Sequence, residues 1–319
     1  SFGKSFICLD NNNNQNLIVF CSSLTAAATT STVSLTNNGV KESVKSKIPL
    51  SIIIDLDNLK LAPHRLLRSA LGDVLCRSTC QVDWLTSHLL LNTEYDETPF
   101  ALQYEDEKIL LENSSKLLIG DYEALAALSR MTLLNGIAAI IVGSTHAGSM
   151  GEHLISHYID MFMGDKHPGT LHGEQVGVTT LLISKIQNQI INYSDNLEFK
   201  KLKVTEEDLE KLFGNKIHTK MFKQFQSKFF DNEKLNNVNN LLKTKWPDHR
   251  AILKKHLLPT DKIEKALKNC GAPISNGELG ISNNFFNRAI QDSFLLRDRF
   301  SYLDVAHYTM TLGNYMIND

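Results

Sequence analysis

Histidines that could bind a metal or move a proton gather in one short part of the sequence. Five of the eleven histidines lie between His146 and His172. His153 and His157 are four residues apart among apolar residues at helical spacing, so both imidazoles are predicted on one face of a helix. His172 follows a Gly-Pro-rich turn at 164–169, near the start of a second helix. The pattern predicts a histidine-lined corner where two helices meet.

Such a corner is suited to a divalent metal. Neutral imidazole is the commonest nitrogen ligand for borderline metals, and a catalytic site holds three protein ligands with one open position. His153 and His172 would supply two ligands, and Asp73, in an apolar helix-like run over 65–91, is the candidate third. A carboxylate facing inward there costs several kcal/mol unless it is paired or binds a cation. Two alternatives stay open. The histidines are core or capping residues that bind no metal, or Gly72 and Asp73 start a helix that Asp73 caps.

Several blocks of the sequence resemble one enzyme family. GEHLISHYID and LHGEQVGV are similar to the metal-site region of the sn-glycerol-1-phosphate dehydrogenases, a branch of the glycerol dehydrogenase, dehydroquinate synthase and iron-containing alcohol dehydrogenase superfamily. IIIDLDNLKLAPHRLLRSALGDVLCRSTCQVDW resembles the segment with the metal aspartate, GAPISNGELGIS a late helix-turn element, and LLRDRFSYLDVAHYTMTLG the closing helix. The resemblance runs from about Leu17 to the C-terminus.

The resemblance implies specific site residues. It places the family's metal ligands on Asp73, His153 and His172, and the second histidine of the H-x-x-x-H pair on His157. The iron-containing branch has a further histidine four residues after the aspartate, and that position here is Arg77. The match is therefore to the three-ligand, zinc-type arrangement, although Ni²⁺ or Fe²⁺ also suits these donors. His157, or a water that it orders, is the expected catalytic proton relay.

The resemblance also implies the fold class, α/β followed by all-α. Residues 1–62 are expected to be the remnant of a Rossmann-like nucleotide-binding domain, and residues 63–319 a larger helical metal and substrate domain of the dehydroquinate synthase type. A buried strand is predicted at 17–21, and residues 43–47 and 52–55 fit two more strands. Helices are predicted at 65–91, 121–142, 176–193, within 197–268 and within 284–315, and Arg297-Asp298-Arg299 is expected to be an ion-paired helix face.

The first thirty residues depart from the family's pattern. Relatives have several glycines that let backbone N–H groups approach a pyrophosphate at a helix N-terminus, but only Gly3 and Lys4 correspond here. Thr25 lies in a segment that resembles the family's Pro-Thr-Ala-Ala-Ser, and Thr30 takes the place of an aspartate that helps to hold the substrate hydroxyls. Gly3, Lys4 and Thr25 are thus the predicted contacts to NAD(H) or NADP(H). The sequence begins with Ser1 and lacks the elements that normally precede this loop, so a fragment or a processed product is one explanation.

Composition excludes some partners. With 42% hydrophobic and 21% charged residues and a net charge of −2, nothing points to nucleic acid or an anionic membrane. The longest apolar run, interrupted by Asn135, is predicted to be too short to span a membrane, and no signal peptide is recognisable, so a cytoplasmic location is expected. The five cysteines form no C-x-x-C pair and are expected to be reduced. Cys76 and Cys80 are four apart on a helix, a spacing that suits a metal, but buried packing is the preferred interpretation.

Two functions follow as hypotheses. The first is a metal-dependent, NAD(P)-linked oxidoreductase that interconverts dihydroxyacetone phosphate and sn-glycerol 1-phosphate, as its relatives do. The alternative is a catalytically inactive relative that serves as a binding or subunit-interface protein, because the nucleotide-binding part is shortened and Thr30 replaces an acidic contact. Relatives assemble through their nucleotide-binding domains, so a homo-oligomer is one of the expected assemblies.

Overall fold

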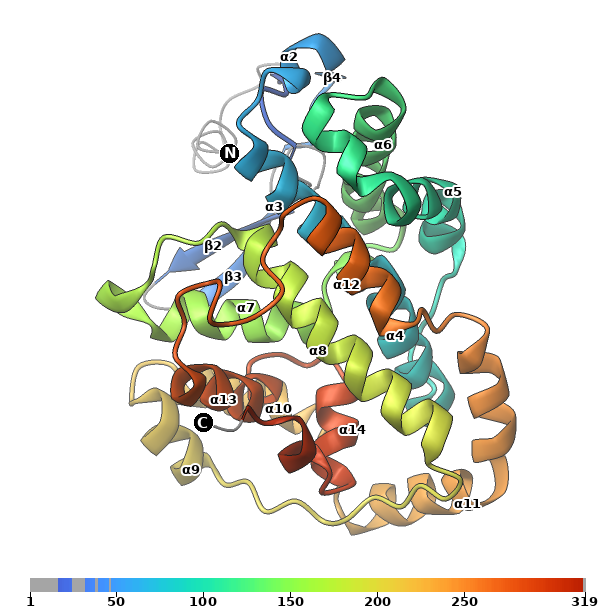
Figure 1. Cartoon of the computed structure of the whole chain (residues 1–319). Coiled ribbons are helices and arrows are strands. Elements are labelled where there is room, and N and C mark those ends of the chain that lie inside the picture. The colour runs from blue at the N-terminus through green and yellow to red at the C-terminus, as the bar shows by residue number, and fades with distance from the viewer. Residues whose placement is uncertain (1–16, 25–31, 38–39, 46, 318–319) are drawn as a thin grey trace.

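The computed structural model describes residues 17–24, 32–37, 40–45 and 47–317. Two short parallel strands and a separate hairpin precede a helical body (Figure 1). β1 (Ile18–Phe20) pairs in parallel with β4 (Ser51–Ile53). β2 (Thr32–Asn37) pairs with β3 (Val40–Lys45) in an antiparallel hairpin. The expected fold class, a reduced α/β part followed by a mostly helical part, is confirmed.

From residue 56 onward the described chain is helical. Its α-helices are α2 (Leu56–Lys60), α3 (His64–Val74), α4 (Arg77–Leu91), α5 (Thr98–Asn113), α6 (Tyr122–Ile141), α7 (Gly151–Phe162), α8 (His172–Tyr193), α9 (Glu206–Phe213), α10 (His218–Gln226), α11 (Asn232–Lys254), α12 (Thr260–Asn269), α13 (Asn283–Asp292) and α14 (Tyr302–Tyr308). Short 3₁₀ turns are η2 (Ser114–Ile119), η3 (His146–Gly148), η4 (Gly164–Lys166), η5 (Ser293–Leu295) and η6 (Leu312–Tyr315).

Helix α8 runs through the middle of the helical body (Figure 1). It packs against α3, α4, α7, α11, α12 and α14. Ile183, Ile186 and Ile190 bury one side in the larger apolar cluster, and Leu181 joins a second cluster with residues of α3, α6 and α12. Because helices from both parts of the helical body pack against α8, they also hold the residues at its N-terminus in place. Leu59, which precedes the predicted domain boundary after residue 62, packs in the second cluster.

The predicted continuous helix over 65–91 is wrong, because the chain forms two helices with a turn at Leu75 and Cys76. Both residues keep helical φ, but their ψ angles are −8° and −9°, which turns the backbone away from the axis of α3. The Sγ of Cys76 donates to the carbonyl oxygen of Asp73 at 3.0 Å within this turn. The turn leaves Asp73 in the last turn of α3, so the alternative in which it caps the start of a helix is also wrong.

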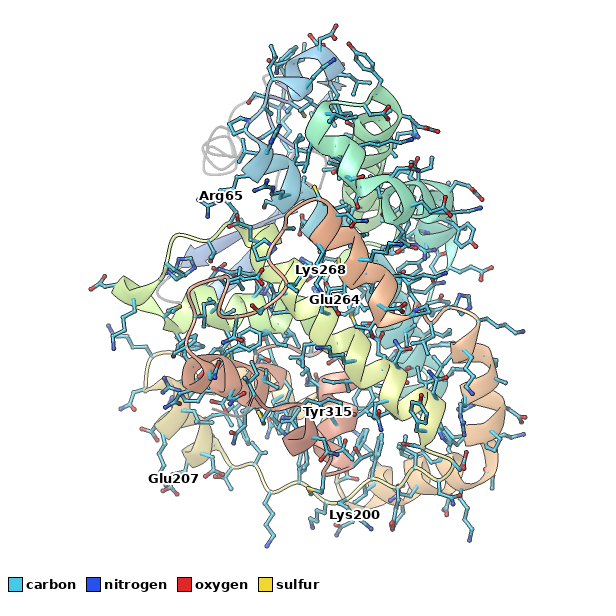
Figure 2. All side chains as sticks on the ribbon, viewed as in Figure 1. Arg65, Lys200, Glu207, Glu264, Lys268 and Tyr315 are labelled. Atoms are coloured by element: carbon cyan, nitrogen blue, oxygen red, sulfur yellow. The ribbon has the colours of Figure 1, made fainter. Side chains whose placement is uncertain are left out.

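Two glycines let α3 and α8 approach backbone to backbone. A Cβ on Gly72 would lie 2.1 Å from the carbonyl oxygen of Gly173, and a Cβ on Gly173 would lie 1.8 Å from that of Ser69. Neither position accepts a larger residue unless the helices separate. At the same end of α8, Arg65 of α3, labelled in Figure 2, donates to Glu174, with Nε 2.7 Å from Oε1. This ion pair links the start of α3 to the first turn of α8, two residues after His172.

Helix α6 forms a longer apolar helix than the sequence analysis expected. It is long and apolar enough to cross a membrane by length and composition, and among the described residues it is the one helix that meets this test. Asn135 does not interrupt it, which corrects the expectation of a run too short to span. The predicted cap at Asp121 is confirmed, since its Oδ1 accepts the N–H of Ala124 at 3.0 Å. Leu125, Leu128 and Met131 are fully buried in the second apolar cluster, which is how a core helix packs.

Some local predictions also change in the sheet region. The strands predicted at 43–47 and 52–55 correspond to β3 and β4, with ends shifted by a few residues. The hairpin strand β2 was not predicted, because its residues are mostly polar. Asp55, which follows β4, caps α2 by accepting the N–H of Asp57 at 2.9 Å.

Candidate metal centre

Three side chains from three helices converge at the predicted corner. Asp73 ends α3, His153 lies in the first turn of α7, and His172 opens α8. The Nε2 atoms of His153 and His172 lie 3.6 and 3.8 Å from Oδ1 of Asp73. One ligand atom from each of the three residues lies within 4.8 Å of the others. The structure thus brings together the three residues that the sequence proposed as metal ligands.

The hydrogen bonds behind the two imidazoles fix their tautomers. Nδ1 of His153 lies 2.9 Å from Oε1 of Glu152, a carboxylate that can only accept, so Nδ1 carries the proton. Nδ1 of His172 lies 3.1 Å from Oγ of Ser156, which donates its own proton to Oε1 of Gln175 at 2.7 Å. That hydroxyl is therefore the acceptor for His172. With Nδ1 protonated in both rings, Nε2 is the nitrogen left to ligate a metal beside Asp73, the arrangement typical of metal-ligating histidines.

The electrostatics of the corner also suit a cation. Burial lowers the pKa of His153, but hydrogen bonds to Asp73, Cys76 and Glu152 outweigh it and raise the pKa well above its usual value. Burial raises the pKa of Glu152, but its hydrogen bonds with His153 and the N–H of Met150 lower the net value. The corner therefore keeps negative charge on both sides of His153 and attracts either a proton or a metal.

Access to the corner comes from one side. His153 is only 6% exposed, whereas the side chain of Asp73 is 19% exposed and that of His172 is 39% exposed. Solvent therefore reaches the corner beside His172 and is excluded behind His153. Access from one side fits a metal site with three protein ligands and one free position.

His157, the predicted proton relay, lies beside the other two histidines. It is buried one turn after His153 on α7, and its ring centroid lies 6.0 Å from that of His153 and 6.1 Å from that of His172. The other predicted site residues, Gly3, Lys4 and Thr25, lie outside the described residues, as does Thr30. Arg77 does not face the corner, since it forms a buried ion pair with Glu107 at 2.9 Å.

Two buried charged residues that hold α7 in place were missed. Asp83 of α4 accepts N–H groups from the start of α7 (Gly151, 3.0 Å) and the start of α14 (Tyr302, 3.1 Å). Arg299, predicted on an exposed helix face, instead lies in a loop, is 8% exposed and donates to Ser149 and Thr145 just before α7. A charged residue inside an apolar helix is a sequence signal for Asp83, but the charge triplet around Arg299 gave no sign of burial.

Parts of the sequence are similar to known glycerol-1-phosphate dehydrogenases. No protein family model matches the chain. A glycerol-1-phosphate dehydrogenase (NAD(P)+) of Pyrococcus horikoshii is 31% identical over 166 residues, 52% of this chain and 45% of that protein. A glycerol-1-phosphate dehydrogenase of Methanosarcina mazei is 33% identical over 52% of this chain and 47% of its own length. The enzyme of that name from Halalkalibacterium halodurans is 24% identical over 83% of this chain and 58% of its own length. The chain spans about half the length of these relatives.

Solved structures share the fold. A 1,3-propanediol oxidoreductase matches with a TM-score of 0.57 and 14% identity over 98% of this chain and 73% of its own. A probable glycerol dehydrogenase from Sinorhizobium meliloti matches with a TM-score of 0.54 and 13% identity over 94% of this chain and 70% of its own. The chain is thus similar in sequence to glycerol-1-phosphate dehydrogenases over about half of its length, and it shares its fold with a probable glycerol dehydrogenase and a 1,3-propanediol oxidoreductase.

Proposed function

We propose that this chain is a metal-dependent, NAD(P)-linked oxidoreductase that interconverts dihydroxyacetone phosphate and sn-glycerol 1-phosphate. The observation that carries the proposal is the convergence of Asp73, His153 and His172 with both Nε2 atoms directed at the carboxylate. The names of its relatives, glycerol-1-phosphate dehydrogenases that use NAD(P)+, support the choice of substrate and nucleotide.

The three residues would hold a divalent ion, and zinc is the proposed ion because the donor set is one carboxylate and two imidazoles. Such an ion, when bound, polarises a carbonyl oxygen and stabilises negative charge on it. Glu152 and Ser156 keep both imidazoles in the ligating tautomer. The exposed side of His172 leaves room for a small polar substrate.

His157 is the proposed proton relay. Its buried ring lies close to both ligand histidines, within reach of a proton that moves to or from a substrate oxygen through one water. Gly3, Lys4 and Thr25 are the proposed nucleotide contacts. The parallel pairing of β1 and β4 supports a nucleotide site at this end, because ligands of open α/β sheets bind beyond the carboxyl ends of parallel strands.

The alternative is an inactive relative that binds a partner. The names of the similar proteins favour the enzyme. The three-residue ligand set and its outer hydrogen bonds fit both hypotheses, because an inactive relative that keeps the metal keeps them as well. We also propose a division into domains after residue 62, a cytoplasmic location and a homo-oligomer. The described cysteines, all free and buried, support a reducing compartment.

The test is reduction of dihydroxyacetone phosphate by NADH or NADPH in the presence of one equivalent of Zn²⁺, followed by loss of nicotinamide absorbance. The unaltered chain should turn over, and His172→Ala should lose activity and bound zinc together. His249→Ala, on α11 outside the corner, is the matched control and should keep both. Zinc binding without turnover for either nucleotide would favour the inactive relative.

A further inference from the structure

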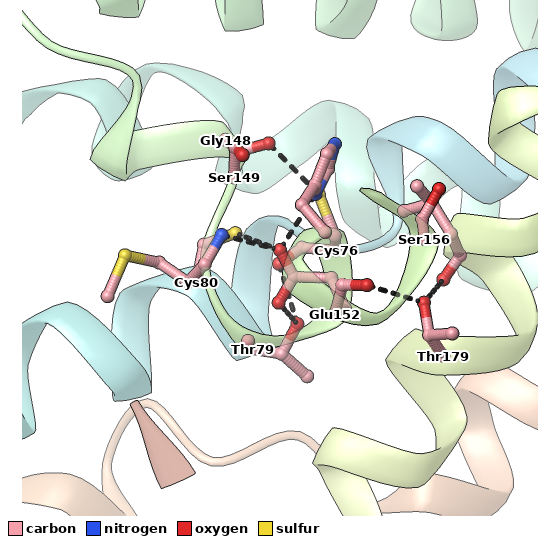
Figure 3. Close-up of polar contacts among 12 residues, drawn as sticks. Cys76, Thr79, Cys80, Gly148, Ser149, Glu152, Ser156 and Thr179 are labelled. Carbon is pink, nitrogen blue, oxygen red and sulfur yellow. Dashed lines mark hydrogen bonds and ion pairs between the residues drawn. The ribbon is translucent and has the colours of Figure 1, made fainter. Parts of the chain in front are cut away.

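Behind the corner lies a second group of potential metal ligands. Cys76, Glu152 and His153 each offer one ligand atom, and these atoms lie within 4.8 Å of one another. All three residues are buried, with Cys76 and Glu152 fully enclosed. Figure 3 shows the thiols of Cys76 and Cys80 approaching Glu152 from different sides. Cys80 lies 3.1 Å from Oε1 of Glu152 but is not part of the group.

The two groups share His153, whose two ring nitrogens point to different groups. Nε2 of His153 faces Asp73, and Nδ1 faces Glu152. A neutral imidazole has a single lone pair, so His153 can ligate at only one of the two positions at a time. An ion at the second position requires the tautomer that leaves Nε2 protonated, and this tautomer cannot serve the corner.

The ligand chemistry of the second position differs from that of the corner. A thiolate, a carboxylate and a neutral imidazole carry two negative charges, which balance a divalent cation and so suit a fully buried place. Thiolate donors select soft or borderline ions, whereas one carboxylate with two imidazoles shows no such preference. Carbonyl oxygens of Asp73 and Gly148, 3.0 and 3.6 Å from Sγ of Cys76, line the same place.

We propose that Cys76, Glu152 and His153 form a second, thiolate-containing cation position that takes a thiophilic divalent ion such as Cd²⁺. Because it needs His153, an ion bound there removes a ligand from the corner and empties it. The inference goes beyond the proposed function and does not depend on turnover. Binding releases the thiol proton of Cys76 and leaves the ion coordinated by sulfur, oxygen and nitrogen.

The test uses Cd²⁺ added to protein that first holds one equivalent of Co²⁺, whose visible spectrum reports the corner. The expected result is a near-ultraviolet thiolate-to-cadmium charge-transfer band that grows as the cobalt spectrum disappears. Cys76→Ser should lose the band and keep the wild-type cobalt spectrum before cadmium is added. Cys270→Ser, a buried cysteine of another cluster, is the matched control and should keep the band.

Three outcomes would overturn the proposal. A band that survives in Cys76→Ser places the thiolate elsewhere, and Cys80→Ser would then show whether that thiol is the ligand. A band that saturates while the cobalt spectrum stays intact shows that the two positions do not share His153. Cadmium NMR of the unaltered protein needs no variant, so misfolding of Cys76→Ser cannot affect it. A cadmium signal typical of oxygen and nitrogen ligands alone is the third outcome that contradicts the proposal.

Discussion

At the scale of single residues, the position of two protons decides what the corner can bind. Glu152 and Ser156 accept from Nδ1 of His153 and His172, so neither ring can turn its lone pair away from Asp73 without breaking a buried hydrogen bond. An unmade buried hydrogen bond costs about 1–3 kcal/mol, so these bonds favour the ligating tautomer of both rings. The metal site therefore depends on residues that do not touch the metal.

The first prediction concerns Ser156. Replacing it with alanine removes the acceptor for Nδ1 of His172 and frees the ring to take the wrong tautomer. We expect zinc affinity to fall by about 10-fold or more, measured by competition with a chelator. Ser184→Ala, which alters a buried serine of α8 that pairs with Thr260, should leave affinity unchanged. Equal affinities for Ser156→Ala and the unaltered chain would show that the outer bond is irrelevant.

The second prediction concerns pH. Between Asp73 and Glu152, His153 binds a proton with a pKa well above its usual value, and a metal must displace that proton. Below this pKa, each unit of falling pH should therefore weaken zinc binding by about tenfold. Calorimetry in buffers of different ionisation enthalpy should show about one proton released for each ion bound at neutral pH. A pH-independent affinity between pH 6 and 8 would contradict this.

At the scale of elements, the contact between α3 and α8 sets the distance between Asp73 and His172. Gly72 and Gly173 each precede or follow a ligand by one residue, and a side chain on either would collide with the backbone of the facing helix. The helices would have to separate by about an ångström or more, which exceeds the roughly 0.5 Å within which a site must hold its ligands. The close contact is thus a requirement of the site as well as of packing.

The third prediction follows from that contact. Gly173→Ala should lower the free energy of unfolding by about 1–3 kcal/mol through overpacking. It should also weaken zinc binding, because Asp73 and His172 move apart. Gly277→Ala, whose Cβ would come no closer than 3.9 Å to a side-chain oxygen, is the control and should change neither. Urea unfolding measures the first effect and chelator competition the second. A destabilised variant with unchanged zinc affinity would contradict the claim that this helix contact positions the ligands.

Sequence reasoning reached some of these elements and missed others for identifiable reasons. Strong helical periodicity located α7, α8 and the Asp121 cap of α6. The turn at Leu75 and Cys76 has no glycine or proline to mark it, so the helix was predicted too long. The hairpin of β2 and β3 had a signal in Asn38-Gly39, a dipeptide common between paired strands, but the polar strand residues hid it.

The site was predictable only in part. The spacing of His153, His157 and His172 pointed to a corner, whereas Asp73 was selected among many acidic residues by resemblance to a family. The roles of Ser156 and Arg299 depend on contacts between segments that lie far apart in the sequence or on different helices. Local patterns carry no information about such contacts.

At the scale of the whole molecule, the three ligands come from three helices that belong to different parts of the fold. α3 packs in the second apolar cluster, α7 in the first, and α8 contributes to both. A metal that joins these helices binds the native state and not the unfolded chain, so it stabilises the molecule as a whole.

The fourth prediction is therefore a metal-dependent stability. At a free zinc concentration of about 100 times the dissociation constant, the free energy of unfolding should rise by about 2.7 kcal/mol. Asp73→Ala should show no rise, while Asp165→Ala, an exposed acidic residue of η4, should behave as the unaltered chain. Thermal unfolding with and without zinc measures the difference, and a rise of equal size in Asp73→Ala would place the zinc elsewhere.

The central claim is that Asp73, His153 and His172 hold one divalent ion, and X-ray absorption of the protein with one equivalent of zinc tests it most directly. The predicted first shell contains only nitrogen and oxygen at about 2.0–2.2 Å, with the scattering of two imidazole rings. Asp73→Ala should lose the ion. A first shell with sulfur at about 2.3 Å, or with fewer than two imidazoles, would contradict the claim.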